Sequence, residues 1–410
     1  MKTTKLSLIL AIVAAFFTNC TMNDDTKIQP ENAKPIVLKV ALQKRIVQDN
    51  EFAFDIFKKT ITESTEPNVL LSPLSISIAL GMTLNGATDE TKTGIEKTLK
   101  MSGLTLENIN DYYKVMQSTL PTIDPTTTLN IANSIWYKTG YPIKSEFITV
   151  NKNYFNAEVR EMDFSQAWAK DTINNWIARK TNNHIKDMLD QIPGDVVMYL
   201  INAVYFKGIW QQPFNTKATK EALFTNNLKN QVKVNMMYQK DTFNYYADEK
   251  TQYLDLAYGN NAFCMTIILP SQISSIKEVL ETLDVDSWNL NLNKMEEEEL
   301  EVYLPRFKSK SKFLLNNVLK TMGMARAFED RDEFRNMANS DLYISRVLHD
   351  TAIEVTEEGT VAAAATIVEM TEKAMFNSIF NANRPFIYII REKSTGVILF
   401  IGKTENIDKF

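Results

Sequence analysis

Few residues in the sequence are of types that could carry out chemistry on a bound substrate. The chain holds two histidines, His184 and His349, and two cysteines, Cys20 and Cys264. His349 precedes Asp350, and this pair could suggest a catalytic triad with some serine, but triad partners meet in space rather than as sequence neighbours. The sequence contains no glycine-rich nucleotide loop, no nucleophile elbow and no zinc-protease motif. An enzyme is therefore the weaker interpretation, and we expect neither a cofactor nor a metal site.

A different kind of candidate is the run of residues 349–373 near the C-terminus. Residues 352–356 alternate apolar and polar side chains as a half-buried strand does, and the two-residue period continues after Gly359. Side chains alternate across a strand, so one face of the continued segment would enter a core together if the segment joined a sheet. That face carries only small or aliphatic residues: Thr360, Ala362, Ala364, Thr366 and Val368. The alternative is a helix or a plain loop, because residues 362–365 are strong helix formers.

Length and composition are those of an ordinary globular protein with a large core. Of the 410 residues, 44% are hydrophobic and 23% are charged, and the net charge is −5. This balance argues against nucleic acid as a partner, because it offers no strongly basic face. Apart from Cys20, the only cysteine is Cys264, so an internal disulfide is excluded and packing must stabilise the protein. Cys264 lies in an apolar run and is expected to be a buried residue rather than a nucleophile.

The N-terminus has the pattern of an export signal. Two lysines precede an apolar run that is too short to span a membrane, and Cys20 follows it directly. This arrangement resembles a bacterial lipoprotein signal, which predicts a signal peptide at residues 1–19, a lipidated Cys20 and a flexible tether at residues 20–44. The alternative is an ordinary signal peptide with an incidental cysteine. We expect an exported lipoprotein of the outer membrane or cell surface, or an extracellular protein, which touches a membrane only through its lipid anchor.

Residues 45–410 contain no repeat or linker and predict one mixed α+β domain. Ser72 is placed to cap a helix that has Pro73 at its first position and is apolar nearly all round. Further helices are expected at 45–60, 89–99, 106–120, 145–155, 166–189, 276–283 and 313–322. Strands are expected at 129–137, 196–206, 232–237, 243–247, 253–257, 262–269, 301–304, 385–391 and 396–402, besides the segment ending at Thr356.

Several stretches of the chain together resemble the serpin family, in the order that the family has them. They are NVLLSPLSISIALGMTLNGA at 68–87, LINAVYFKGIWQQPF at 200–214, VYLPRF at 302–307, the segment 349–366, NRPFIY at 383–388 and LFIGK at 399–403. The resemblance covers residues 45 to 405. It implies the serpin fold, with about nine helices around a large central mixed sheet, two smaller sheets, and an exposed reactive-centre loop at about residues 358–380.

The resemblance also implies roles for individual residues. The family's shutter, a hydrogen-bonded cluster beneath the central sheet, maps to Ser72, Ser75, Asn202 and His349. The breach, where the loop first enters the sheet, includes Trp210. The hinge of the loop maps to Glu357, Gly359, Thr360, Val361, Ala362, Ala363, Ala364 and Ala365. Each of these residues could also be an ordinary cap, core or strand residue.

The family mechanism gives the small alternating face a purpose. A protease attacks the loop as a substrate, and the loop then inserts into the central sheet as a new strand before the acyl-enzyme can be hydrolysed. Insertion satisfies backbone hydrogen bonds and buries the small face. The stretch from Thr360 to Lys373 spans roughly 45 Å at about 3.3 Å per residue, which would carry the protease to the opposite pole of the sheet. The small hinge residues therefore predict an inhibitory member.

The scissile bond is expected between Lys373 and Ala374, by counting from the hinge; counting back from Asn383 differs by one residue. A lysine at this position suits the carboxylate-bearing pocket of trypsin-like serine proteases. Met370, Met375 and Phe376 are alternative baits for chymotrypsin-like or elastase-like enzymes, and cysteine proteases that accept lysine are further targets. We expect a monomer, and no polyanion activation, because the helix at 106–120 has a single lysine. Two other hypotheses are a non-inhibitory binding or chaperone-like module, and a hydrolase based on His349 and Asp350.

Overall fold

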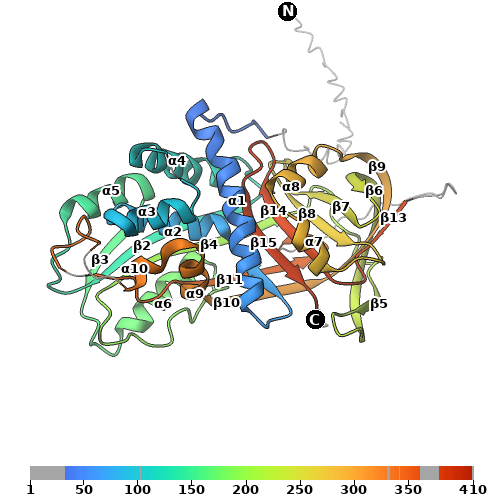
Figure 1. Cartoon of the computed structure of the whole chain (residues 1–410). Helices are drawn as coiled ribbons and strands as arrows, with labels where there is room; N and C mark the ends of the chain where they lie inside the picture. Colours follow the sequence, from blue (N-terminus) through green and yellow to red (C-terminus); the bar gives the residue numbers. More distant parts are fainter. Residues whose placement is uncertain (1–32, 102, 330–332, 341, 361–377, 409–410) are drawn as a thin grey trace, which may run out of the picture. The chain divides into compact units, whose positions relative to one another are not determined.

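The central helix of the fold is set by the apolar segment that follows Ser72. A computed structural model describes residues 33–101, 103–329, 333–340, 342–360 and 378–408, which belong to the unit Asn32–Phe410 (Figure 1). Helix α2 (Pro73–Leu84) is buried almost all round, as its uniformly apolar sequence predicts. It contacts helix α1 (Val40–Glu63), strand β4 (Met198–Ile209) and strand β15 (Ile398–Thr404). Helix α2 therefore lies between the two sheets of the protein.

The number of helical segments agrees with the expected number of about nine. Helices α9 (Asn316–Leu319) and α10 (Ala325–Glu329) are joined by a π-helical turn (Lys320–Met324), so the described residues hold nine separate α-helical segments. The others, besides α1 and α2, are α3 (Asp89–Thr98), α4 (Leu106–Thr119), α5 (Ser145–Phe155), α6 (Ala169–Lys180), α7 (Ile276–Thr282) and α8 (Val285–Leu292), with a 3-10 turn at Leu120–Thr122.

A six-stranded sheet carries the candidate hinge. Its strands follow the order β10 (Phe307–Leu314), β11 (Leu348–Thr356), β12 (Gly359–Thr360), β4, β2 (Thr128–Lys138) and β3 (Glu158–Met162). Only β2 and β3 pair in parallel, and the other neighbours are antiparallel. Because β12 is antiparallel to both β4 and β11, these two strands run in the same direction on either side of it.

The remaining strands form a nine-stranded sheet. Its main path is β1, β15, β14, β8, β7, β6, β9 and β13, and β5 pairs with β6 off this path. The bounds are β1 (Val69–Leu71), β5 (Lys220–Thr225), β6 (Gln231–Ala247), β7 (Thr251–Ala257), β8 (Phe263–Pro270), β9 (Glu296–Pro305), β13 (Ser378–Asn381) and β14 (Phe386–Glu392). The two smaller sheets that were expected are thus continuous, because the long strand β6 pairs with β5, β7 and β9. The α+β class and the serpin fold are confirmed.

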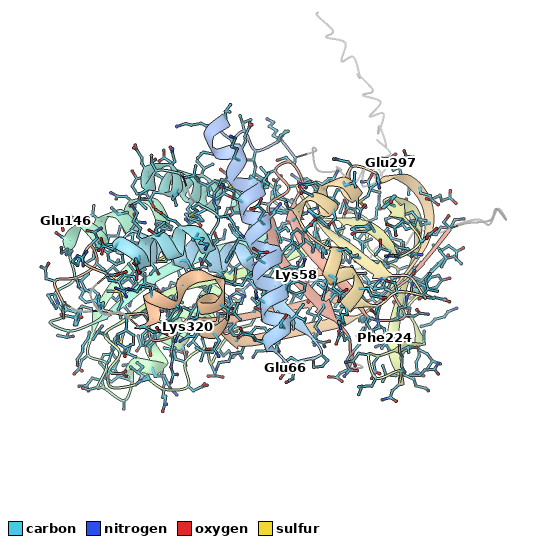
Figure 2. All side chains as sticks on the ribbon, viewed as in Figure 1. Lys58, Glu66, Glu146, Phe224, Glu297 and Lys320 are labelled. Atoms are coloured by element: carbon cyan, nitrogen blue, oxygen red, sulfur yellow. The ribbon has the colours of Figure 1, made fainter. Side chains whose placement is uncertain are left out.

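Apolar side chains fill the space between the sheets and helices. One large cluster extends around α1, α2 and both sheets, and a smaller one lies between α6 and strands β2 and β4. The smaller cluster includes Trp136, Trp176 and Ile201. Charged side chains such as Glu146 and Glu297 lie on the outside (Figure 2). Cys264 is buried in β8, as expected, and burial raises the pKa of its thiol to about 12.

Three local expectations were wrong. The tether predicted at residues 20–44 is too long, because α1 begins at Val40 and both Leu38 and Leu42 are buried in the core. The helix predicted at 166–189 ends at Lys180, because Asn182 and Asn183 adopt left-handed backbone angles. The helix predicted at 313–322 begins only at Asn316.

The preceding residues form β10, in which lysines alternate with buried side chains, and this strand was not predicted. The predicted signal peptide and Cys20 lie outside the described residues.

Candidate functional site

Glu357 anchors the start of the hinge by an ion pair that crosses the end of the six-stranded sheet. Its carboxylate accepts three hydrogen bonds from the Arg306 guanidinium at 2.6–2.9 Å, and a further one from the Thr219 hydroxyl. Only 4% of the Glu357 side chain is exposed. Burial alone would raise the pKa of Glu357, but the hydrogen bonds from Arg306 and Thr219 outweigh it and lower the pKa. Glu357 therefore stays ionised and fixed at neutral pH.

The turn after Glu357 requires a glycine. Gly359 has a φ of 144°, and a Cβ atom built on it would lie 2.1 Å from the carbonyl oxygen of Gly208 on β4. The two backbones approach so closely because Gly359 pairs with Ile209, and Thr360 pairs with Gly208. On the other side, Thr360 pairs with Val355 of β11. The hinge thus already forms the first two residues of a strand between β4 and β11.

Thr360 is held in this strand by an aromatic stack. Its side chain is fully buried, and its hydroxyl oxygen lies 2.7 Å from the hydroxyl of Tyr258. The Tyr258 ring stacks on Trp210, with ring centroids 4.4 Å apart and planes 13° from parallel. The indole nitrogen of Trp210 donates to the carbonyl of Thr356 at 2.9 Å, and its backbone nitrogen donates to that of Glu358. Trp210 therefore contacts the hinge directly, where the resemblance places the breach.

The predicted shutter residues form two separate networks in place of one cluster. The backbone nitrogen of Ser72 donates to Nε2 of His349 at 3.0 Å. The Ser72 side chain was expected to cap α2, but it donates to the carbonyl of Leu399 instead. On the other strand, Ser75 donates to the side-chain oxygen of Asn202, whose nitrogen donates to Asn133 at 2.6 Å. One network holds β11 to helix α2, and the other holds β4 to it.

His349 does not have the geometry of a catalytic base. Its Nε2 accepts the backbone hydrogen of Ser72, so no lone pair of that nitrogen is left for a nucleophile. Burial lowers the pKa of His349 to about 3, which keeps the imidazole neutral. Asp350 points to the opposite face of β11 because it is the next residue of the same strand. The pair therefore contributes to structure, and the hydrolase hypothesis finds no support in it.

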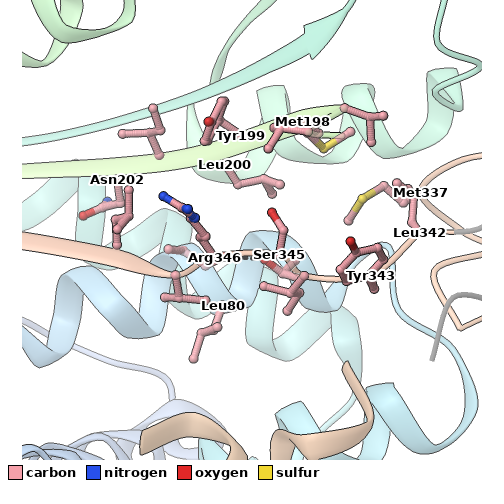
Figure 3. A pocket seen from close by; sticks show the side chains of 18 of the residues that line it. Leu80, Met198, Tyr199, Leu200, Asn202, Met337, Leu342, Tyr343, Ser345 and Arg346 are labelled. Carbon is pink, nitrogen blue, oxygen red and sulfur yellow. Dashed lines mark hydrogen bonds between the residues drawn. The ribbon is translucent and has the colours of Figure 1, made fainter. Parts of the chain in front are cut away.

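Between the two networks the six-stranded sheet is open. Within the described residues, β4 and β11 have no direct backbone pairing, and a cavity of about 310 Å³ separates residues 195–202 from residues 342–349 (Figure 3). Helix α2 contributes Ser75 and Leu80 to its lining. Asn202 and His349 thus stand on opposite walls of this cavity, at the end nearer to the hinge.

The remaining expected site residues belong to the expected loop. Residues Val361, Ala362, Ala363, Ala364 and Ala365 of the hinge, and Lys373 and Ala374 of the expected scissile bond, lie outside the described residues. The loop expected at 358–380 is described at its two ends, which are strands β12 and β13. In the described part of the chain, no group of three or more histidine, cysteine or acidic side chains could hold a metal ion, and no helix is long and apolar enough to cross a membrane.

Sequence reasoning missed four residues of the site: Gly208, Thr219, Tyr258 and Arg306. Each lies far from the hinge in the sequence and reaches it only through the pairing of strands. The tyrosine-glycine pair at 258–259 and Gly208, two positions before Trp210, are local signals of a close approach, but they do not identify the partner.

Comparisons with known proteins agree with this geometry. The model of the family described as "Serpin (serine protease inhibitor)" matches residues 47–407. The chain is 33% identical to Serpin B11 of Homo sapiens, over 86% of this chain and 97% of the relative. It is 34% identical to a serpin-like protein of Methanosarcina acetivorans, over 87% and 86% of the two chains.

A solved structure of the thermophilic serpin tengpin in its native state is also similar, with a TM-score of 0.83. It is 32% identical, and the match covers 92% of this chain and 97% of that one. With the shared fold and the matching residues from the first helix to the last strand, the chain belongs to the serpin family.

Proposed function

We propose that this protein is a suicide-substrate inhibitor of endopeptidases, and of trypsin-like serine proteases in the first place. The family is one of protease inhibitors in general, so the proposal concerns the mechanism and the target of this member. The protease would cleave after Lys373 and remain bound to it as an acyl-enzyme while the loop inserts between β4 and β11. Catalysis then belongs to the protease, and this chain supplies the trap.

One observation supports the proposal most directly: Gly359 and Thr360 already occupy the strand position between β4 and β11, and a cavity continues that position. A strand inserted there would gain backbone partners on both sides, which is the strongest reason for a cleaved loop to move into a sheet. The hinge offers no obstacle, because the buried Thr360 is small and the residues after it are small as well.

The experiment is to mix the full chain with trypsin and to analyse the products by SDS gel and mass spectrometry. We expect a covalent adduct that survives SDS, and a released peptide that begins at Ala374. The variant Lys373→Gln removes the side chain that the trypsin pocket binds, and it should lose the adduct without a change in thermal stability. Clean cleavage of the loop with no adduct would contradict the proposal and favour the alternative of a non-inhibitory binding or chaperone-like module.

Other proteases extend the same experiment. If the adduct forms with an elastase-like, chymotrypsin-like or cysteine protease but not with trypsin, the mechanism stands and the target class changes. In that case the released peptide identifies the bond, for example at Met370 or Phe376. The proposal includes no cofactor, and the partner is the protease in a one-to-one covalent complex with a monomer.

The proposed location is outside the cytoplasm, through the signal at residues 1–19 and a lipid on Cys20. In cells, the chain should label with a fatty-acid analogue and fractionate with membranes, and Cys20→Ser should abolish both. If the unchanged chain and Cys20→Ser are both recovered in the soluble fraction, the proposal of a lipid anchor is contradicted.

A further inference from the structure

A segment between helix α6 and strand β4 covers part of the outer face of the six-stranded sheet, the face away from helix α2. This strap consists of residues 184–190. The ring of His184 stacks on Tyr205 of β4, with ring centroids 5.1 Å apart. Met188 and Leu189 are buried in the smaller apolar cluster, and both also line the cavity between β4 and β11. The strap therefore forms part of the outer wall of this cavity.

One lysine of β10 holds the strap to the sheet. Nζ of Lys312 donates to the backbone carbonyl of Asp187 at 3.0 Å and to the carboxylate of Asp190 at 2.9 Å. The Asp190 side chain is 81% exposed, so water weakens this ion pair. Strands β11 and β12 separate β10 from β4 in the sheet. The strap therefore connects two strands that are not neighbours.

Asp350 of β11 carries a buried carboxylate without a partner. It lies directly opposite Lys312 in the pairing of β10 with β11, so the two side chains share the outer face. Asp350 is only 9% exposed, and its Oδ1 is buried with no hydrogen-bond partner among the described residues. Burial raises the pKa of Asp350, and the charges of Lys310 and Lys312 offset this only in part. A carboxylate enclosed in this way is unfavourable.

The packing of Leu348 identifies what covers Asp350. Leu348 lies two positions before Asp350 and therefore on the same face of β11. It packs against the apolar cluster that contains the strap residues Ile185, Met188 and Leu189. The strap is therefore the cover that keeps water from the Asp350 carboxylate.

Lys312 does not serve both carboxylates while the strap lies on the sheet. Its ammonium is bonded to the strap, at Asp190, and the carboxylate of Asp350 directly opposite it stays unpaired. If the strap lifted, water would reach Asp350, and Lys312 would be free to pair with it across the two strands. The same lysine thus has one partner in the strap and another in the sheet.

We propose that Lys312 is a latch with two partners: it pairs with Asp190 while the strap lies on the sheet, and with Asp350 when the strap lifts. Asp350 favours the lifted strap, because lifting hydrates its carboxylate and frees the lysine opposite to it. Lys312 and Asp350 are thus positioning residues of the strap, which in turn exposes or covers the cavity. The inference goes beyond the proposed function, because it concerns the uncleaved chain and needs no protease.

Thiol labelling measures how often the strap lifts. In a Cys20→Ser background, Met188→Cys places a thiol at a buried position of the strap, and the buried Cys264 reports global unfolding in the same chain. We expect a thiol reagent to modify position 188 faster than Cys264, because the strap lifts without global unfolding. Ile185→Cys, at a second buried position, replaces Met188→Cys if the latter does not keep Cys264 protected.

Single substitutions in this background should move the labelling rate in opposite directions. Asp350→Asn should slow labelling of the strap by about 5- to 30-fold, because the closed strap then encloses no charge. Asp190→Asn should speed it by about 1.5- to 5-fold, because only an exposed ion pair is lost. Asp55→Asn is the control: it makes the same change in an exposed ion pair with Lys100, on helix α1, and should leave the labelling of the strap unchanged.

The double variant tests the exchange of partners. In Asp190→Asn, Lys312 has lost its partner in the strap and can pair with Asp350 while the strap is closed. Adding Asp350→Asn to this variant should therefore no longer slow the labelling. A merely structural role of Asp350 would give the same slowing in both backgrounds.

Three results would overturn the inference. Labelling of Asp350→Asn at the unchanged rate or faster would show that Asp350 does not oppose the closed strap. Additive effects of Asp190→Asn and Asp350→Asn would show that Lys312 does not exchange partners. Equal labelling rates of the strap and of Cys264 in every variant would show that the strap does not lift by itself. None of these results bears on the proposed function, which the adduct with trypsin tests.

Discussion

The hydroxyl of Tyr258 and the side-chain oxygen of Thr360 lie 2.7 Å apart, although 102 positions separate the two residues in the sequence. Tyr258 packs between Trp210 and Gly208, where an added Cβ on the glycine would lie 2.6 Å from the tyrosine ring. The ring therefore has little freedom, and burial raises the pKa of its hydroxyl. Thr360, the first residue of the hinge strand that carries a side chain, is therefore fixed against a rigid surface.

This contact predicts that Thr360→Arg converts the inhibitor into a substrate. The Thr360 side chain is fully buried, so a guanidinium there would lose its hydration without gaining a carboxylate partner, at a cost of several kcal/mol. The protease should then cleave the loop and leave before insertion. The measurement is the fraction of loop cleaved without adduct at a fixed ratio of trypsin to inhibitor.

Ile379→Arg is the matched control for this substitution. Ile379 lies on β13 at the other end of the loop, and 54% of it is exposed, so the same charge needs no burial there. Inhibition should be unchanged. If Thr360→Arg inhibits as well as the unchanged chain, insertion at Thr360 is not required for trapping.

Tyr258→Phe isolates the hydrogen bond from the stack. The ring still packs on Trp210, but the Thr360 hydroxyl is left without its buried partner, which costs about 1 kcal/mol. We expect a modest rise in the fraction of cleaved, unbound loop, and Thr360→Val in the same chain should add little to it, because both changes remove one bond. Additive effects of the two substitutions would mean that the hydroxyls act independently.

Gly359→Ala should block the hinge by contact rather than by backbone strain alone. The added Cβ would lie 2.1 Å from the Gly208 carbonyl, and a φ of 144° is a region that side chains rarely adopt. Gly396→Ala shares a positive φ, of 80°, but nothing lies within 4 Å of its Cβ position. Strain alone costs about 1–3 kcal/mol at either site, so a larger loss of stability in Gly359→Ala than in Gly396→Ala, measured by urea unfolding, would identify the clash.

The anchor of the hinge gives a prediction on stability. Arg306→Gln leaves the Glu357 carboxylate buried without its cation, which should reduce the free energy of unfolding by about 3 kcal/mol at pH 7. The lowered pKa of Glu357 means that its contribution is present above about pH 4.5 and is lost as the pH falls further. Urea unfolding at pH 7 and pH 4 measures both. The double variant Arg306→Met with Glu357→Leu should recover much of the loss; a double variant as unstable as Arg306→Gln would contradict this account.

The sequence predicts those features of this site that depend on neighbouring residues, and it does not predict contacts between residues that are far apart in the chain. The period of residues 352–360 and the need for Gly359 are local properties, and they predict the strand and the hinge. The partners of Glu357 and Thr360 are not local, because Thr219, Tyr258 and Arg306 meet them only when β4, β10 and β11 assemble. The resemblance names the four shutter residues together but does not specify the individual contacts between them, so the sequence predicted one cluster. The structure separates them, since Asn202 and His349 stand on different strands with a cavity between.

Acid should destabilise the protein through His349. Burial lowers the pKa of its imidazole to about 3, whereas in the unfolded chain the pKa is about 6.5, so only the unfolded state binds a proton between these values. Stability is therefore complete above pH 6.5 and falls as the pH drops toward 3, by up to about 1.4 kcal/mol per pH unit. In His349→Gln the side-chain amide oxygen can still accept the hydrogen bond from the Ser72 backbone. The loss of stability that His349 causes between pH 7 and pH 5 should therefore disappear in this variant.

His184 is the other histidine, and burial lowers its pKa as well, so His184→Gln is the control and should keep most of the pH dependence. Denaturant unfolding of the three chains at pH 7, 6 and 5 separates the two residues, above the range in which Glu357 titrates. If His349→Gln and the unchanged chain lose stability equally between pH 7 and pH 5, the buried imidazole does not control the response of the sheet to acid.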